Sequence, residues 1–198
     1  MTLRLGILAS GSGSNLQAIL DACACGRLDA EVVAVVSDRP EARALERATT
    51  AGVGLVECFA RSNVQDRREW DRGLADVVAS ASPDWVVLAG FMRVLSSTFL
   101  DRFANRVVNL HPALPGELPG TRAIERAFTE FQGGHRTRTG VMVHLVPDEG
   151  VDNGPVLAAR EVPMFADDTI DTLAARMHEN EHQLLVEALA RLTEEVPA

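Results

Sequence analysis

The segment Val107–Pro112 carries two polar side chains in an otherwise apolar run. If the run is a strand, Asn109 and His111 lie on the same face, about 7 Å apart along the chain. A carboxamide can donate a hydrogen bond to a negatively charged oxygen, and an imidazole can exchange a proton near neutral pH. A lone histidine at a strand end more often bonds a backbone carbonyl, but Pro112 and the segment Pro115–Gly120 predict an ordered loop over this place. We therefore interpret Asn109 and His111 as candidate catalytic groups.

A second candidate is Asp152, in the acidic turn Asp148–Pro155. Acidic turns are most often solvated hairpin loops. The ligand spacing and terminal Glu of a calcium loop are absent. A carboxylate beside His111 would hold the imidazole in place and favour its charged form. A role for Asp152 therefore depends on whether the fold brings this turn to His111.

A glycine-rich segment, Ser10–Asn15, stands between an apolar run and a helical pattern. Its glycines let the backbone approach a ligand closely, and the N–H groups that open a helix attract an anion. The third glycine of the dinucleotide fingerprint is replaced by Leu16, and the lysine of a P-loop is absent. A plain turn, with Ser14 or Asn15 as the N-cap, is the alternative. The context between a strand and a helix favours a phosphate site.

Two other segments carry weaker signals. Ala89–Leu95 is apolar around a single Arg93, which would suit a flat heterocycle with a carboxylate tail. Core packing with a surface arginine is the default interpretation of such a segment. Glu179–His182 falls inside the last helical pattern, where a solvated helix face is the simplest interpretation.

Composition excludes several functional classes. The 198 residues are 46% hydrophobic and 24% charged, as in globular proteins, and the formal net charge is −9. This acidic balance disfavours nucleic-acid binding. Cys23, Cys25 and Cys58 lack metal-ligand spacing and predict reduced thiols. Neither a signal peptide nor an apolar run of about 20 residues is present. We expect a cytoplasmic protein without a membrane segment.

Apolar runs alternate with helical patterns along the chain. Strands are expected at Leu3–Ala9, Glu31–Ser37, Val53–Cys58, Asp84–Gly90, Arg106–Leu110, Gly140–Val146 and Pro155–Val162. Helices are expected at Asn15–Cys25, Glu41–Ala51, Asp66–Ser82, Ser97–Phe103, Ala123–Phe131 and Thr169–Leu192.

This alternation predicts an α/β fold. Strands that are apolar on both faces indicate a mostly parallel, Rossmann-like open twisted sheet with helices on both faces. The last two strands follow each other closely, which predicts an antiparallel C-terminal extension. We expect one domain over residues 1–198, with a phosphate- or nucleotide-binding half at about 1–105 and a catalytic half at about 106–198.

Taken together, the motifs resemble a known family. S-G-S-G-S-N-L-Q-A-I, L-A-G-F-M-R, N-L-H-P-A-L, V-H-L-V with D-N-G-P-V, and E-H in the last helix occur here in this order. The set resembles the phosphoribosylglycinamide formyltransferases, which are folate-dependent enzymes of purine synthesis. The resemblance covers Leu5 to about Leu189. It implies formyl transfer from 10-formyltetrahydrofolate, as co-substrate, to the amine of glycinamide ribonucleotide. It implies no metal and is compatible with a homodimer.

The resemblance also implies roles for particular residues. Those matching the family's motifs are, for catalysis, Asn109, His111 and Asp152; for the substrate phosphate, Gly13, Ser14 and Asn15; for the glycinamide, Glu181; and for the folate, Arg67, Met92, Arg93, Leu95 and Val146. Arg68 is the alternative to Arg67.

Three positions depart from the family pattern. The stretch from His144 to Asp152 is one residue longer than usual, which bears on the shape of the loop that faces the pterin. Met142 stands where Ser or Thr is usual, and a thioether cannot donate a hydrogen bond. Glu117 occupies a place that is often basic.

Other functions compete with this interpretation. One is another enzyme that uses 10-formyltetrahydrofolate, such as a deformylase or a sugar or amine formyltransferase. Methionyl-tRNA formyltransferases and deformylases usually carry an additional domain, for which 198 residues leave no room. A non-catalytic nucleotide-binding module would explain the glycine-rich segment but not Asn109, His111 and Asp152 together. The discriminating observation is whether Asp152 lies beside His111.

Overall fold

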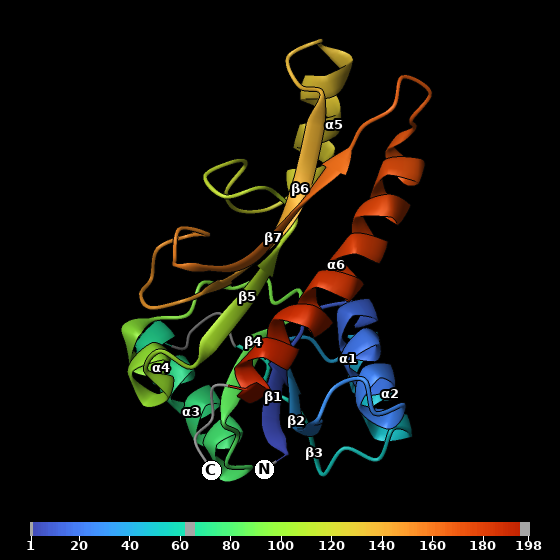
Figure 1. Cartoon of the computed structure of the whole chain (residues 1–198). Helices are drawn as coiled ribbons and strands as arrows, with labels where there is room; N and C mark the ends of the chain where they lie inside the picture. The colour runs from blue at the N-terminus through green and yellow to red at the C-terminus, as the bar shows by residue number, and fades with distance from the viewer. Residues whose placement is uncertain (1, 62–65, 195–198) are drawn as a thin grey trace.

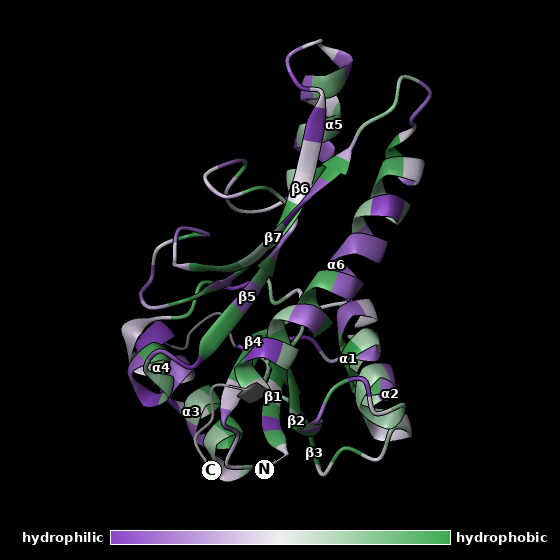
Figure 2. Cartoon of the chain, viewed as in Figure 1, coloured by the Kyte–Doolittle hydropathy of each residue, from purple (hydrophilic) through white to green (hydrophobic). Residues whose placement is uncertain are grey.

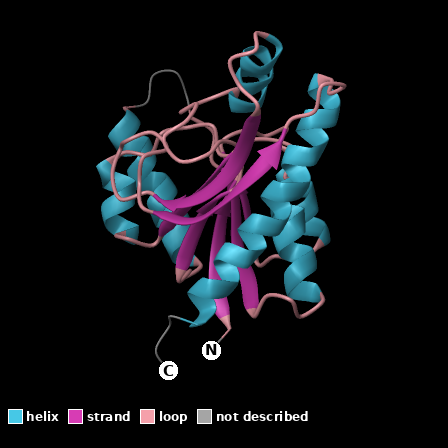
Figure 3. Cartoon of the chain, turned by 45° about the horizontal axis from the view of Figure 1, so that its top comes forward, coloured by secondary structure: helices cyan, strands magenta, loops and turns pink. Residues whose placement is uncertain are grey.

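The structure, a computed structural model, describes residues 2–61 and 66–194. The strands are β1 (Leu3–Leu8), β2 (Ala30–Ser37), β3 (Leu55–Cys58), β4 (Trp85–Leu88), β5 (Val107–His111), β6 (Arg138–Leu145) and β7 (Val156–Pro163). The helices are α1 (Ser14–Ala24), α2 (Arg43–Thr50), α3 (Arg67–Ser80), α4 (Ser97–Leu100), the 3-10 helix η1 (Asp101–Phe103), α5 (Ala123–Gln132) and α6 (Ile170–Glu194). The strands form one sheet in the order β3-β2-β1-β4-β5-β6-β7, with helices on both sides (Figures 1 and 3).

Strands β1 to β5 form the parallel part of the sheet. Parallel neighbours need a crossover connection, which the helices supply here. Strand β1 lies between β2 and β4, and five of its six residues are buried. Apolar residues predominate along β1, β2 and β4 (Figure 2), as burial on both faces of a sheet requires.

Strands β6 and β7 extend the sheet in the antiparallel direction beyond β5. The helix α5 lies in the connection from β5 to β6, at the far end of the molecule in Figure 1. Strand β7 is the outer strand, and it carries Arg160 and Glu161. Arg160 pairs with Glu187 of α6, and Glu161 pairs with Arg138 of β6.

Two apolar layers cover the sheet. The larger packs residues of α1, α2 and the long α6 against one face, and α6 contributes Leu173, Met177 and Leu185. The smaller packs α3 and α4 against the other face, with Trp70 and Phe99 almost fully buried. The predicted α/β class, with its antiparallel extension and two helical layers, is confirmed.

Differences from the expected elements fall at their ends. The fourth strand was expected to reach Gly90 but ends at Leu88, because the chain turns away at Gly90, whose φ is +76°. The helix expected at Ser97–Phe103 is one α-helical turn, α4, followed by η1. Among the described residues, none of the helices is both long enough and apolar enough to span a membrane.

Candidate active site

Strand β5 orients Asn109 and His111 toward the same side of the sheet. Their neighbours Val108 and Leu110 point the other way, into the larger apolar layer. In the antiparallel pairing with β6, Asn109 lies opposite His144, and His111 lies opposite Met142. Directly opposite residues share a face of the sheet, so these four side chains form one patch.

The connection from β6 to β7 brings Asp152 to this patch. The β6–β7 register shifts between Val143 and His144, and bulges of this kind redirect side chains near functional sites. The Leu145 N–H donates to the Pro155 carbonyl at 2.8 Å, which closes the turn. At Gly154 a Cβ atom would overlap the Leu145 carbonyl oxygen, so only glycine fits. The turn, which the sequence predicts to be one residue longer than in the family, reaches His111.

Asp152 stands at the centre of the polar cluster. Its Oδ1 accepts a hydrogen bond from Asn109 Nδ2 at 3.0 Å, and its Oδ2 lies 3.2 Å from His111 Nδ1. The Gly120 N–H donates to Oδ2 at 2.7 Å. His144 Nε2 lies 3.1 Å from Asn109 Nδ2 and 3.5 Å from Asp152 Oδ1. The structure therefore brings the three predicted catalytic side chains into direct contact.

The other ring nitrogen of His111 faces the loop that follows β5. Nε2 lies 3.0 Å from the Leu118 carbonyl oxygen. Arg126, on α5, donates to the same carbonyl and to that of Pro119, each at 2.6 Å. Both nitrogens of His111 therefore face acceptor oxygens, and a neutral ring can donate to only one of them.

Burial and hydrogen bonding act on the two acid–base groups in different ways. Burial alone would raise the pKa of Asp152, but the hydrogen bonds from His144 and the Gly120 N–H outweigh it and hold that pKa below its ordinary value. Burial lowers the pKa of His111, although Asp152 and the Leu118 carbonyl oppose this, and His144 and Arg126 add to the lowering. Burial of His111 therefore opposes the charged ring that the sequence predicts, while Asp152 and the Leu118 carbonyl favour it.

Met142 contributes to that burial. Its side chain is 1% exposed and shares a sheet face with His111, its directly opposite partner. The apolar thioether occupies the place where the family pattern has a hydroxyl. Glu117, the third position that departs from the family pattern, forms an ion pair with Arg136, which also pairs with Glu130.

A cleft of about 210 Å³ opens beside the cluster. Its walls are residues 90–95, 109–112 and 120–123, with the β6–β7 turn closing one side. The predicted folate residues Met92, Arg93, Leu95 and Val146 all line it. Met92 is 56% exposed, whereas Leu95 is 3% exposed and packs mainly in the core.

Arg93 is fixed by a buried carboxylate. Its Nε donates to Asp38 Oδ2 at 2.6 Å, and its guanidinium lies 5.4 Å from the Trp70 ring centroid. Ser10 Oγ donates to the other oxygen of Asp38, also at 2.6 Å, and accepts from the Met92 N–H at 2.9 Å. Asp38 thus joins the start of the glycine-rich segment to the wall of the cleft.

Arg67 lies beside the cleft rather than in its wall. It donates to the Val94 carbonyl at 3.0 Å and lies 3.2 Å from a carboxylate oxygen of Glu149. A neighbouring cavity of about 290 Å³ contains Arg67 together with Met92 and Arg93, which also line the cleft. Arg68 is exposed and lines neither space, so the geometry favours Arg67 over Arg68.

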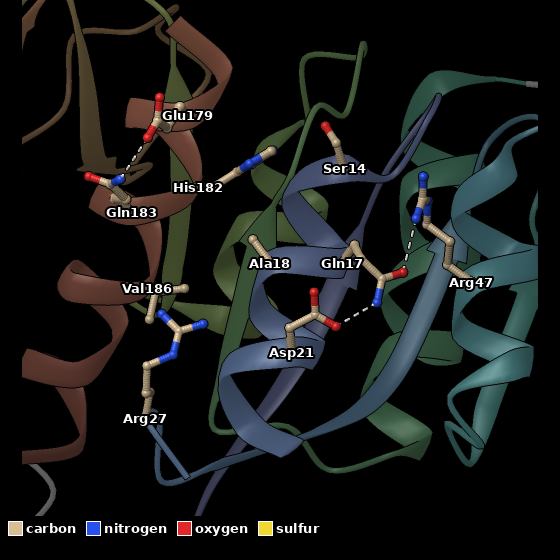
Figure 4. Close-up of a pocket in the computed structure, with 10 residues that line it drawn as sticks. All are labelled: Ser14, Gln17, Ala18, Asp21, Arg27, Arg47, Glu179, His182, Gln183 and Val186. Atoms are coloured by element: carbon tan, nitrogen blue, oxygen red, sulfur yellow. Dashed lines mark hydrogen bonds between the residues drawn. The ribbon is translucent and has the colours of Figure 1, made fainter. Parts of the chain in front are cut away.

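Gly13, Ser14 and Asn15 lie at the start of α1, outside the cleft wall. Gly13 is the N-cap with a φ of +70°, and no side chain caps the helix. Asn15 Oδ1 is buried without a hydrogen-bond partner among the described residues. Ser14 borders a cavity of about 440 Å³ between α1 and α6 (Figure 4).

Glu181, on α6, is 4% exposed and binds His178 Nδ1 at 2.9 Å. It does not line the cleft among the described residues, so the structure does not bring it to the cluster. Within residues 2–61 and 66–194, no three His, Cys, Asp or Glu side chains are grouped so that they could hold a metal ion.

Several residues that build the cluster and the cleft wall are not identified from the sequence. The V-H-L-V motif contains His144, but only the β5–β6 pairing reveals its partner Asn109. Asp38 is 28 residues from Ser10 and 55 from Arg93, a separation at which no sequence pattern signals contact. Gly120 and Leu118 act through backbone atoms, which residue types do not reveal.

The chain is similar to known proteins along nearly its whole length. A phosphoribosylglycinamide formyltransferase of Mycobacterium tuberculosis is 44% identical, covering 96% of this chain and 84% of its own length. One from Dictyostelium discoideum is 38% identical, with 98% and 99% covered. The crystal structure of glycinamide ribonucleotide transformylase 1 from Symbiobacterium toebii has a TM-score of 0.90 and 38% identity, with 98% and 88% covered. The formyl transferase family model matches residues 3–189. The chain belongs to the formyl transferase family.

Proposed function

We propose that the chain transfers the formyl group of 10-formyltetrahydrofolate to the amine of glycinamide ribonucleotide in de novo purine synthesis. The products are formylglycinamide ribonucleotide and tetrahydrofolate. The observation that carries the proposal is the contact of Asn109, His111 and Asp152 beside a cleft. The names of the relatives, which cover nearly the whole chain, support the same reaction.

The cleft is the proposed folate site. Phe91, Val94 and Val146 give it apolar walls that suit a flat ring, and the β6–β7 turn offers backbone polar groups. We propose that Arg93 and Arg67, which line the same neighbouring cavity, bind the acidic tail of the folate. Because Arg93 Nε is engaged by Asp38, we propose that its terminal nitrogens face the ligand.

Gly13, Ser14 and Asn15 are the proposed phosphate site of the ribonucleotide. The uncapped start of α1 supports this, because unpaired N–H groups and the helix dipole attract an anion. The buried Asn15 Oδ1, which has no partner among the described residues, is an acceptor, so it is available to a hydroxyl or amine of the ligand and not to its phosphate oxygens. We propose that Glu181 holds the glycinamide, which requires that the ligand bridge the distance from α6 to the cluster.

The proposed chemistry starts with attack of the substrate amine on the formyl carbon. A C–N bond forms and the formyl oxygen becomes negatively charged. Asn109 Nδ2 and His111 Nε2 donate hydrogen bonds to that oxygen, which takes the place of His144 Nε2 on Asn109 and of the Leu118 carbonyl on His111. His111 takes a proton from solvent before the attack and keeps it through the reaction, and the developing negative charge favours this charged ring by raising the pKa of His111. Asp152 orients it.

The intermediate then collapses. The oxygen reforms the carbonyl, the bond from the formyl carbon to N10 breaks, and N10 takes a proton. We propose that Asp152 helps to carry that proton from the attacking amine to N10, through water if the distance requires it. One C–N bond forms and one breaks, and the proton lost by the amine is gained by N10. No covalent intermediate with the protein forms.

The test is an assay of tetrahydrofolate release from 10-formyltetrahydrofolate, with and without glycinamide ribonucleotide. Release that depends on the amine, together with formylated product detected by mass spectrometry, is the expected result. Release without the amine would instead identify a deformylase. No release under either condition, from folded protein, would contradict both enzymatic functions and favour a nucleotide-binding module.

A further inference from the structure

The glycine-rich segment is held in place by α2 at three successive residues. The Ala44 N–H donates to the Gly11 carbonyl at 3.2 Å. Arg47 Nε donates to the Ser12 carbonyl at 2.9 Å. Gly13 packs so closely on Ala44 that a Cβ at residue 13 would lie 2.7 Å from the Ala44 Cα. Two consecutive carbonyls of the segment therefore point toward α2.

The contacts with α2 also fix the direction of the backbone N–H groups in the glycine-rich segment, because the peptide unit is planar. In a trans peptide the C=O and the following N–H point in opposite directions. With the Gly11 and Ser12 carbonyls bound by α2, the N–H groups of Ser12 and Gly13 point away from α2. Successive N–H groups that point the same way form a concave site for an anion. If the Ser12 peptide rotated, its carbonyl oxygen would replace an N–H and repel the anion.

Arg47 is itself held by α1. Its Nη1 donates to Gln17 Oε1 at 3.0 Å, and Gln17 Nε2 donates to Asp21 Oδ1 at 2.8 Å. Figure 4 shows Gln17 between Arg47 and Asp21, with Ser14 at the end of α1 that starts at the glycine-rich segment. The guanidinium therefore has a defined orientation and adds a positive charge at the segment, although the chain as a whole carries −9.

We propose that Arg47 is a positioning residue for the phosphate of the amine substrate, acting through the Ser12 carbonyl. The inference rests on the proposed function for the identity of that substrate. The ligand chemistry it requires is a phosphate monoester bound by the backbone N–H groups of residues 12–15. Arg47 keeps those groups turned toward the phosphate and offsets part of its charge.

The test compares Arg47→Gln with the wild-type protein. The expected result is a KM for glycinamide ribonucleotide raised about 10-fold or more, because a hydrogen bond from a charged donor is lost. The KM for 10-formyltetrahydrofolate and kcat should stay within about twofold, since Arg47 contacts neither the cleft nor the cluster. Arg47→Lys, which keeps the charge and one donor, should fall between the two.

A substrate control separates positioning from general damage. With the dephosphorylated riboside as amine substrate, Arg47→Gln and wild type should show the same kcat/KM. Arg43→Gln is the matched protein control, because Arg43 is an exposed arginine one turn earlier on α2. It should leave every constant unchanged. Equal effects of both variants, or a loss that persists with the riboside, would overturn the inference.

Direct binding keeps this test independent of the proposed reaction. Inorganic phosphate is the probe, and calorimetry should show binding to the wild type that is weakened about 10-fold in Arg47→Gln. If the wild type binds phosphate but transfers no formyl group, the proposed function fails and the role of Arg47 stands. If transfer occurs and Arg47→Gln binds phosphate and substrate normally, only the role of Arg47 fails. If Arg47→Gln does not fold, the lysine variant decides by the same measurements.

Discussion

Asp152 divides its two carboxylate oxygens between different partners. Oδ1 accepts from Asn109, and Oδ2 accepts from the Gly120 N–H and faces His111. The residue itself has a φ of +53°, a left-handed backbone conformation that Asp adopts more readily than most residues. One side chain therefore aligns both proposed donors to the formyl oxygen and attaches them to the loop after β5.

Asp152→Asn is expected to lower kcat by about 10²–10³-fold while leaving the fold intact. The amide keeps an oxygen for the Gly120 N–H but places no negative charge beside His111. The melting temperature should change by no more than about 5 °C. Steady-state kinetics and a thermal melt check both statements, with the exposed Asp167→Asn as the matched charge control. Turnover close to that of the control would contradict the role given to Asp152.

Replacing Met142 should change the pKa of His111. Met142→Thr places a hydroxyl beside the ring, which lessens the burial penalty and raises the pKa of His111 toward its ordinary value. An NMR pH titration of the ring measures this. Asp152, His144 and Arg126 also face the ring and remain unchanged. Val143→Thr, on the opposite face of the same strand, should not move the pKa of His111.

For Met142→Thr we also expect a change in how the free energy of unfolding depends on pH. The lowered pKa of His111 means that the neutral ring stabilises the fold fully above its unfolded pKa of about 6.5. That contribution is lost as pH falls through the folded pKa. In Met142→Thr the pKa of His111 is shifted less, so the variant loses less free energy of unfolding than the wild type as the pH falls. The difference in stability between the two proteins should therefore narrow between about pH 7 and pH 5. Urea denaturation at several pH values checks this, and a deficit that widens would contradict it.

At the scale of elements, the β6–β7 turn decides where Asp152 lies. Two structural features determine the path of this turn. They are the register shift after Val143 and the close packing of Gly154 on the Leu145 carbonyl. The sequence predicts both strands and the turn, because apolar runs flank glycine and proline. It does not predict the bulge, because a bulge depends on pairing with a neighbouring strand.

Gly154→Ala should therefore displace the turn and lower both stability and activity. A Cβ that overlaps a backbone oxygen forces the backbone to move, at a cost of about 1–3 kcal/mol. Asp152, two residues earlier, should lose its alignment with His111, so kcat should fall. Gly54→Ala is the control, because its Cβ would meet open space and its stability should change by less than about 0.5 kcal/mol. Equal stability of both variants would contradict this account.

The predictable part of the site follows from local periodicity. Asn109 and His111 share a face because side chains alternate along any strand. The sequence alone makes Asp152 and Arg93 weak candidates, the family resemblance assigns them roles, and the structure supplies their contacts. Neither the strand periodicity nor the family resemblance identifies Arg126 and Asp38, because only the tertiary fold brings their partners to them. For Glu181 the structure supplies a contact with His178, and its predicted role toward the glycinamide stays a prediction.

At the scale of the whole molecule, one sheet runs through both sequence halves. β4, from the first half, pairs with β5 of the second, and α6 packs on α1. We propose on this basis that residues 1–105 and 106–198 form a single cooperative unit rather than two.

Urea unfolding should therefore show a single transition. Fluorescence of Trp70 and Trp85 reports on the first half, and far-UV circular dichroism includes the 25-residue α6 of the second. The two curves should coincide, with one midpoint. Separate midpoints would show that the halves unfold independently.

The outer strand β7 has a consequence for handling the protein at high concentration. An edge strand presents backbone groups that can recruit a strand from another molecule and so seed aggregation. Here Arg160 and Glu161 interrupt the edge with charge, and Pro163 ends it without a backbone donor. Crystallisation screens that replace surface charges to reduce side-chain entropy should therefore leave these two residues in place and draw their substitutions from the helical surfaces.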